Sequence, residues 1–102
     1  MLKVQYGDTE VRVKFDHRIL DPIQIHDLSG TCVDEDRKCS LATIEIHTVN
    51  NVSQYKGISI CHPDDNFCRA TGRKIALSFA MYVFSKPMRK AVWKKYIETC
   101  NS

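Results

Sequence analysis

The sequence lacks both a long apolar segment and an export signal. None of its apolar runs approaches the roughly 20 residues that a membrane-spanning helix needs, and Met1 is followed by the alternating, charged segment Leu2–Tyr6. A signal peptide would instead have a basic start followed by an unbroken apolar stretch. We therefore expect a cytoplasmic protein that does not associate with membranes.

Metal-binding and catalytic motifs are also scarce. The five cysteines contain no C-x-x-C pair, so a zinc site that uses Cys61, His62, Cys68 and His47 is a weak alternative to buried thiols and a loop histidine. The chain has no G-x-S-x-G or H-E-x-x-H motif, and the TGRK segment at 71–74 lacks the spacer and first glycine of a P-loop. A catalytic Cys–His pair stays open, but any chain with these residue types offers one. We predict that the protein is not an enzyme and holds no metal and no cofactor.

Positive charge is concentrated in the last third of the chain. Residues 1–65 hold seven Lys/Arg against eleven Asp/Glu, whereas residues 66–102 hold eight Lys/Arg against Glu98 alone. Such asymmetry between two halves of a chain indicates an anionic partner. The alternative is that the basic segment pairs with acidic residues of its own fold or of a neighbouring subunit, for example with the run Asp34-Glu35-Asp36.

Four segments have the alternating pattern of strands in an antiparallel sheet. The first two flank a Gly-Asp turn and predict a hairpin; the full set is Leu2–Tyr6, Glu10–Phe15, Leu41–Val49 and Tyr55–Cys61. Residues 16–40 lack a clear period, and Pro22, Gly30 and the acidic run predict a long loop with one short extended piece at Ile23–Ile25. A loop of this length is either functional or contains an element that the pattern does not reveal.

The hydrophobic period then changes to that of a helix. Asp64 or Asp65 is a suitable N-cap for a helix that we predict to continue to about Phe84. Its apolar stripe consists of Cys68, Gly72, Ile75, Ala76, Phe79 and Val83. Because glycine is unfavourable inside a helix, Gly72 predicts a close approach of this helix to the sheet or to another backbone.

A second helix is predicted after Ser85, with Pro87 in its first turn. Its buried face consists of Met88, Val92, Trp93 and Tyr96. The resulting fold class is α+β: an antiparallel sheet of about four strands followed by two C-terminal helices packed on one face. We expect residues 1–102 to form a single domain, with 1–61 mainly β and 62–102 a helical hairpin.

The start of the first predicted helix is the predicted binding site. A helix N-terminus presents free N–H groups and a positive dipole to an anion. Asn66, Arg69 and Arg73 are spaced to share one helix face. The guanidinium groups of the two arginines suit phosphate. Phe67 offers a nucleobase a stacking surface. The alternatives are that Phe67 packs in the core, that Asn66 is a second cap and that the arginines form a solvated face. We predict six ligand-binding residues: Asn66, Phe67, Arg69, Arg73, Lys74 and Arg89.

Residues 60–77, followed by Arg89, Trp93 and Tyr96, resemble a pattern in small accessory proteins of bacteriophages. The shared features are a strand, a short Pro-Asp turn, a helix with G-R-K-I-A-L and a further helix with the Arg…Trp…Tyr spacing. The resemblance covers about residues 55–98. Within the phage class it is to the Thoeris anti-defence sponge family, which also acts against CBASS defence.

The resemblance implies a non-catalytic counter-defence protein in the cytoplasm of the host cell. It implies homo-oligomers, often hexamers, that sequester a cyclic oligonucleotide or a cyclic ADP-ribose variant so that the host effector is not triggered. Two alternatives stay open. One is a nucleic-acid-binding phage protein that uses the basic second helix, which is less favoured because the rest of the chain is acidic. The other is an inhibitor that docks on a host protein, for example through residues 34–36.

Overall fold

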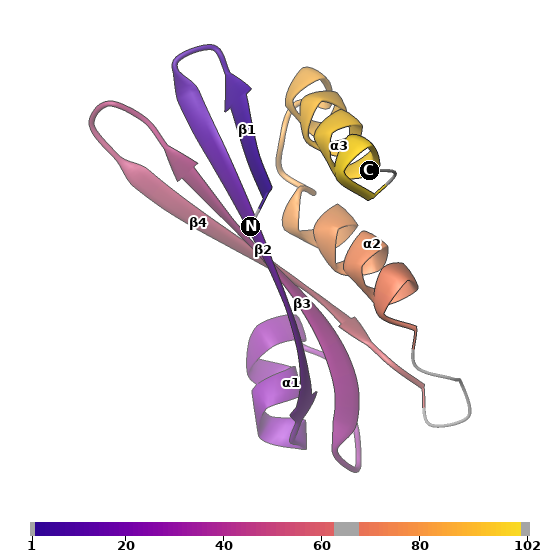
Figure 1. Ribbon diagram of the computed structural model, residues 1–102. Coiled ribbons are helices and arrows are strands. Elements are labelled where there is room, and N and C mark those ends of the chain that lie inside the picture. The colour runs from indigo at the N-terminus through magenta and orange to yellow at the C-terminus, as the bar shows by residue number, and fades with distance from the viewer. Residues whose placement is uncertain (1, 63–67, 101–102) are drawn as a thin grey trace.

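The computed structural model describes residues 2–62 and 68–100. In chain order the elements are β1 (Leu2–Tyr6), β2 (Thr9–Leu20), α1 (Pro22–Ser29), β3 (Arg37–His47), β4 (Val52–Ile60), α2 (Arg69–Ala80) and α3 (Lys86–Cys100). The four strands form one sheet in the order β1-β2-β3-β4, and every neighbouring pair is antiparallel (Figure 1). The predicted α+β class, with about four antiparallel strands and two C-terminal helices, is therefore confirmed.

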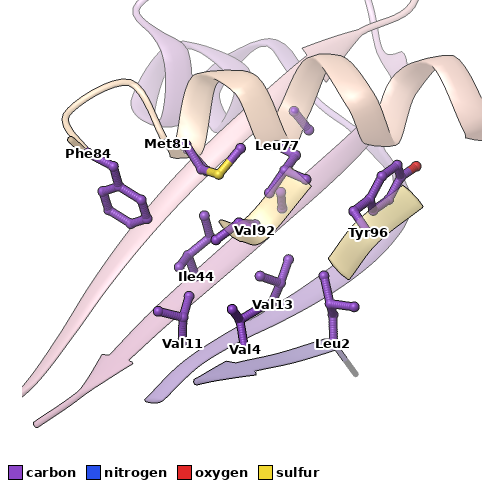
Figure 2. Close-up of a cluster of buried hydrophobic side chains, with 13 residues drawn as sticks. Leu2, Val4, Val11, Val13, Ile44, Leu77, Met81, Phe84, Val92 and Tyr96 are labelled. Carbon is purple, nitrogen blue, oxygen red and sulfur yellow. The ribbon is translucent and has the colours of Figure 1, made fainter. Parts of the chain in front are cut away.

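Helices cover both faces of the sheet. On one face α2 lies over β3 and β4 and α3 lies against β1. Side chains of α2 and α3 meet those of the strands in one core, where Leu77 and Met81 are directed toward Ile44 and Val92 (Figure 2). All four of these side chains are fully buried, so truncating any of them to alanine would leave a cavity and cost about 2–5 kcal/mol. On the other face α1 closes a smaller cluster of Leu20, Ile25, Cys39 and Ile58.

Two glycines let α2 lie against the sheet at backbone contact distance. A Cβ atom at Gly57 of β4 would overlap the carbonyl oxygen of Ala76 and lie 2.5 Å from the amide nitrogen of Ala80. A Cβ atom at Gly72 of α2 would overlap Oγ of Ser40 and lie 2.8 Å from its Cβ. The predicted role of Gly72 in a close approach to the sheet is therefore confirmed.

The prediction of a loop over residues 16–40 is wrong. β2 continues to Leu20, residues 22–29 form α1, and β3 begins at Arg37. Residues 23–25, predicted as an extended piece, belong to the helix. Only the short segment between α1 and β3 remains as a connection.

The helix α1 exists because its ends are capped. The Asp21 side chain accepts a hydrogen bond of 2.8 Å from the Gln24 amide, and the Gln24 side chain accepts one of 3.0 Å from the Asp21 amide. This reciprocal pair is a capping box, and Pro22 at the first helical position already has a helical φ. Gly30 ends the helix in the left-handed conformation, with φ 73°. Residues interpreted as loop markers are thus the two boundaries of a helix.

The predicted boundaries and apolar stripe of α2 need correction. The expected N-cap residues Asp64 and Asp65 lie outside the described residues, and the helix ends at Ala80 rather than near Phe84. Gly72 is buried as predicted, together with Ala76. Four other members of the stripe are exposed, and three of them are large: Cys68, Ile75 (41%), Phe79 (61%) and Val83 (66%). Their places in the core are taken by Leu77, Ala80, Met81 and Phe84.

The second C-terminal helix begins as predicted. α3 starts directly after Ser85, whose carbonyl oxygen accepts a hydrogen bond of 3.0 Å from the Arg89 amide. The predicted inner residues Met88, Val92, Trp93 and Tyr96 all belong to the core or pack against it. Different parts of the sheet support the two helices, because α2 contacts β3 and β4 whereas α3 contacts β1. Over the described residues, each helix is too short or too polar to span a membrane.

Candidate anion-binding site

A cavity of about 430 Å³ lies between the first two strands and the two C-terminal helices. Val13, Phe15 and His17 alternate along β2, so they share the face that α2 and α3 cover. Arg73 enters the cavity from α2, and Tyr96 enters it from α3. The described residues that line it are Leu2, Val13, Phe15, His17, Arg73, Tyr96 and Thr99. The volume lies within the range of small-molecule sites, about 300–1,000 Å³.

Aromatic rings form one wall of the cavity. The ring centroids of Phe15 and Tyr96 are 5.7 Å apart at an interplanar angle of 63°. On its other side Tyr96 contacts Trp93, with centroids 5.7 Å apart at 85°. These edge-to-face contacts fix Tyr96, which is only 4% exposed. The half-buried ring of Phe15 is therefore the aromatic surface that a ligand can reach.

His17 is held at the floor of the cavity by the sheet. Its Nδ1 atom lies 2.9 Å from Oγ of Ser40, the neighbouring β3 residue with which it is paired. Ser40 is completely buried, and Gly72 of α2 lies directly against it. The close approach of α2 to the sheet thus places the first turns of the helix beside His17.

Burial and two nearby positive charges lower the pKa of His17. Burial lowers the pKa of His17, the charges of Arg69 and Arg73 lower it further, and only Asp16 opposes them. Both guanidinium groups therefore project a positive potential into the cavity. A bound anion would cancel that potential.

The positive charge of the C-terminal helices is not neutralised within the described part of the chain. None of the ion pairs there involves a lysine or arginine of α2 or α3. The acidic run, one suggested partner, instead pairs locally: Asp34 and Glu35 lie 3.3 and 3.5 Å from the Arg37 guanidinium. Arg73 therefore lines the cavity without a carboxylate from residues 2–62 or 68–99.

An exposed thiol stands at the start of α2. Cys68 occupies the N-cap position in an extended conformation (φ −119°, ψ 112°), and its Sγ accepts a hydrogen bond of 3.4 Å from Oγ1 of Thr71. This bond is the main cause that lowers the pKa of Cys68; the amides of Thr71 and Ala70 and the charge of Arg73 act in the same direction, while burial opposes them. Within residues 2–62 and 68–99, no three His, Cys, Asp or Glu side chains gather closely enough to hold a metal ion.

The structure brings together only part of the predicted site. Arg73 lines the cavity, and Arg69, one turn earlier, is exposed and acts on His17 through its charge. Lys74 is exposed and is absent from the lining, because one residue along a helix rotates the side chain by about 100°. The predicted residues Asn66 and Phe67 lie outside the described residues.

The remaining predicted residue, Arg89, is exposed on α3 and also absent from the lining. It precedes Tyr96 by seven residues, which is about 10 Å along the helix axis. The sequence interpretation missed Phe15, His17 and Ser40 as site residues. Val11, Val13 and Phe15 alternate along β2, and a continuation by two residues would have placed His17 on the same face of the sheet. The predicted strand, however, ended at Phe15.

No family model, curated protein or solved structure matches this chain. The resemblance to a phage counter-defence family therefore stays a prediction. Function has to be inferred from the chemistry of the cavity, which combines guanidinium charge, an accessible ring and a half-buried imidazole around one space.

Proposed function

We propose that the protein binds a small anionic ligand of the nucleotide class in the cavity between β2, α2 and α3. The observation that supports this proposal is the meeting of Arg73 and the Phe15 ring around a space of about 430 Å³. A guanidinium group forms a planar fork that matches phosphate, and an accessible aromatic ring can stack on a base. Nucleotides carry both groups, so one ligand would use both walls.

The imidazole of His17 complements this arrangement. Its lowered pKa favours the neutral form. A phosphate near Arg69 and Arg73 would replace positive potential with negative potential and so raise the pKa of His17. Binding and protonation of His17 would therefore be linked.

We further propose that the ligand is held and not converted. Among the described residues that line the cavity, His17 and Tyr96 are acid–base candidates, and none is a carboxylate, a cysteine or a lysine. Within the predicted counter-defence role, the bound molecule would be a cyclic oligonucleotide or a cyclic ADP-ribose variant. Retention of such a signal would lower its free concentration and leave the host effector inactive.

A matched pair of charge deletions tests the proposed site. Arg73→Gln removes the guanidinium that lines the cavity, whereas Lys74→Gln removes an exposed charge from the adjacent position. Loss of a hydrogen bond to a charged group costs about 1.5–3 kcal/mol, so Arg73→Gln should weaken ligand binding about 10- to 150-fold. Lys74→Gln should leave Kd within about twofold. Isothermal titration with a panel of cyclic nucleotides measures both, and equal effects of the two variants would contradict the site.

The fate of the ligand tests sequestration. The protein is incubated with each candidate signal and then heat-denatured, and the released small molecules are analysed by chromatography. Intact ligand in stoichiometric amount is expected. Degraded ligand would show an enzyme instead, and failure to retain any candidate would refute nucleotide-class binding.

Nucleic-acid binding is a second candidate that one observation favours. The exposed cations of α3 form no ion pairs with the described residues: Lys86, Arg89, Lys90, Lys94 and Lys95. The aromatic residues of α3, however, are occupied in packing, because Tyr96 is 4% exposed and Trp93 packs against the core. Such a surface would bind phosphates without stacking on bases. A strongly salt-dependent affinity for random duplex DNA, unaffected by Arg73→Gln, would favour this candidate.

A further inference from the structure

Among the described residues, the strand β4 forms a long edge of the sheet that no further strand covers. It pairs with β3 on one side, and it is the last strand in the order β1-β2-β3-β4. Its nine residues run in uninterrupted register with β3, without a bulge or a proline, and Lys56 is their only charged residue. Natural edges are usually short, charged, bulged or covered. An edge with almost none of these features is suited to pairing with another strand.

The hydrogen-bond pattern shows which backbone groups of β4 face outward. The Cys61 amide donates to the Lys38 carbonyl at 2.9 Å, and the Thr48 amide donates to the Asn51 carbonyl at 2.9 Å. In an antiparallel pair, hydrogen-bonded positions alternate with positions whose N–H and C=O groups point away. Odd-numbered positions of β4 therefore face β3. The outward-facing positions are Val52, Gln54, Lys56, Ile58 and Ile60.

Apolar side chains flank this edge on both faces of the sheet. A groove of about 500 Å³ runs along residues 56–60, with Leu28 of α1 on one side and Ile75 and Phe79 of α2 on the other. These three side chains are 42%, 41% and 61% exposed. Large apolar residues on both sides of a strand edge would be covered by a further strand that brings its own flanking helices.

The size of the surface fits a second copy of the chain. Nine residues of strand span about 31 Å, and a sheet with a packed layer on each face is about 20 Å deep. The resulting area of about 600 Å² approaches the roughly 800 Å² per partner of a standard interface. A short peptide strand alone would leave Ile75 and Phe79 largely uncovered, whereas a second copy supplies an equivalent helix.

We infer that β4 pairs with β4 of a second copy of this chain, antiparallel and about a twofold axis, to form a continuous eight-stranded sheet. A symmetric interface brings the same surface from both copies together. With the axis at Lys56, Gln54 lies opposite Ile58 and Val52 lies opposite Ile60 of the second copy, so all nine residues of each strand pair. The two lysines then lie opposite each other, which weakens the pairing but leaves the backbone hydrogen bonds in place. The α2 helices then lie on the same side of the joined sheet, with Phe79 of each copy directed at the other. This inference does not depend on the proposed ligand.

A matched pair of substitutions tests the interface. Phe79→Asp places a charge in the groove, whereas Tyr82→Asp changes a residue that is 81% exposed but does not line it. Analytical ultracentrifugation should show twice the 11.7 kDa chain mass at micromolar concentration for the unaltered protein. Phe79→Asp should raise the dimer Kd at least about tenfold, because it places a charge where the pairing copies bury an apolar ring. Tyr82→Asp should leave the dimer Kd within about threefold.

Hydrogen exchange gives a second readout. A loss of stability speeds exchange at inward- and outward-facing amides of β4 alike, whereas loss of the interface speeds it at the outward-facing amides alone. Outward-facing amides of β4 exchange slowly only if another strand covers them, so the Gln54, Lys56 and Ile58 amides should be protected in the dimer and exposed in Phe79→Asp. Circular dichroism would be used to check that the variants are folded. Lys56→Pro, which adds a ring at an outward-facing position and spares the β3 ladder, should also give monomers. A monomer at 100 µM, or a dimer in which these amides exchange freely, would overturn the inference.

Discussion

Replacing Gly57 by alanine would drive β4 and α2 apart. The added Cβ would overlap the Ala76 carbonyl oxygen and lie 2.5 Å from the Ala80 amide nitrogen, where an ordinary contact begins at 3.4 Å. These atoms belong to the helix backbone, so no side-chain rotation relieves the clash and α2 has to move by about 1 Å. Overpacking of a core costs about 1–3 kcal/mol, and a backbone clash belongs at the upper end of that range.

The predicted cost can be measured against a matched glycine. Gly57→Ala should lower the free energy of unfolding by about 3 kcal/mol, which corresponds to a fall in Tm of roughly 12–24 °C for a domain of this size. Gly7→Ala adds a Cβ that meets nothing within 4 Å but enforces alanine at φ 59°, so it should cost only about 1 kcal/mol. Urea and thermal unfolding followed by circular dichroism, at one protein concentration, compare the two. A Gly57→Ala protein within about 1 kcal/mol of the parent would refute the backbone-contact argument.

The remaining predictions concern two titratable groups. Because the fold lowers the pKa of His17, its contribution to stability is complete above the unfolded value of about 6.5 and is lost as the pH falls through the lower folded pKa. Between pH 7.5 and 5 the free energy of unfolding should therefore fall more steeply for the parent than for His17→Gln, and parallel curves would contradict the shift. Because the hydrogen bond from Thr71 is the main cause that lowers the pKa of Cys68, Thr71→Val should slow alkylation of Cys68 by iodoacetamide at pH 7 by roughly a factor of three. Peptide mass spectrometry gives that rate, and an unchanged rate would exclude a role for the hydroxyl.

Alternation along the strands predicted most of the sheet, because one face of each strand is buried against helices. The prediction failed for residues 16–40, although the segment contains helix signals. Asp21, Pro22 and Gln24 lie at the start of α1, and Gly30 caps its end. With eight residues and only Ile25 fully buried, α1 has almost no apolar period of its own. Its identity rests on capping and on one contact with the far face of the sheet, which periodicity does not report.

The sequence predicted that α2 forms, but not which side of the helix faces the sheet. The expected stripe gave large residues the inner positions, but Ile75 and Phe79 face outward and Ala76 and Ala80 face the sheet. The reason lies in another element: Gly57 of β4 leaves room for the helix backbone itself. A helix that approaches this closely needs small residues at the contact, so its large residues turn away.

The candidate site was predicted from one side only. The helical spacing of Arg69 and Arg73 indicated a basic face, which the structure places beside the cavity. Phe15 and His17 come from a strand more than fifty residues earlier in the chain. Nothing in the local pattern of either segment encodes their meeting, because it depends on the order of the strands and on the depth at which α2 sits.

Four small residues lie where α2 meets the sheet: Gly57, Gly72, Ala76 and Ala80. They form a sequence pattern that does not depend on surface residues. Charged residues at the surface can be exchanged without disturbing this packing, but a chain that keeps this helix in place must keep little or no side chain at Gly57 and Gly72. The lasting signature is therefore a spacing: a glycine in the final strand, a second fifteen residues later, and alanines four and eight residues beyond it. Any chain that packs a helix against a sheet in this way should have small residues at those four positions.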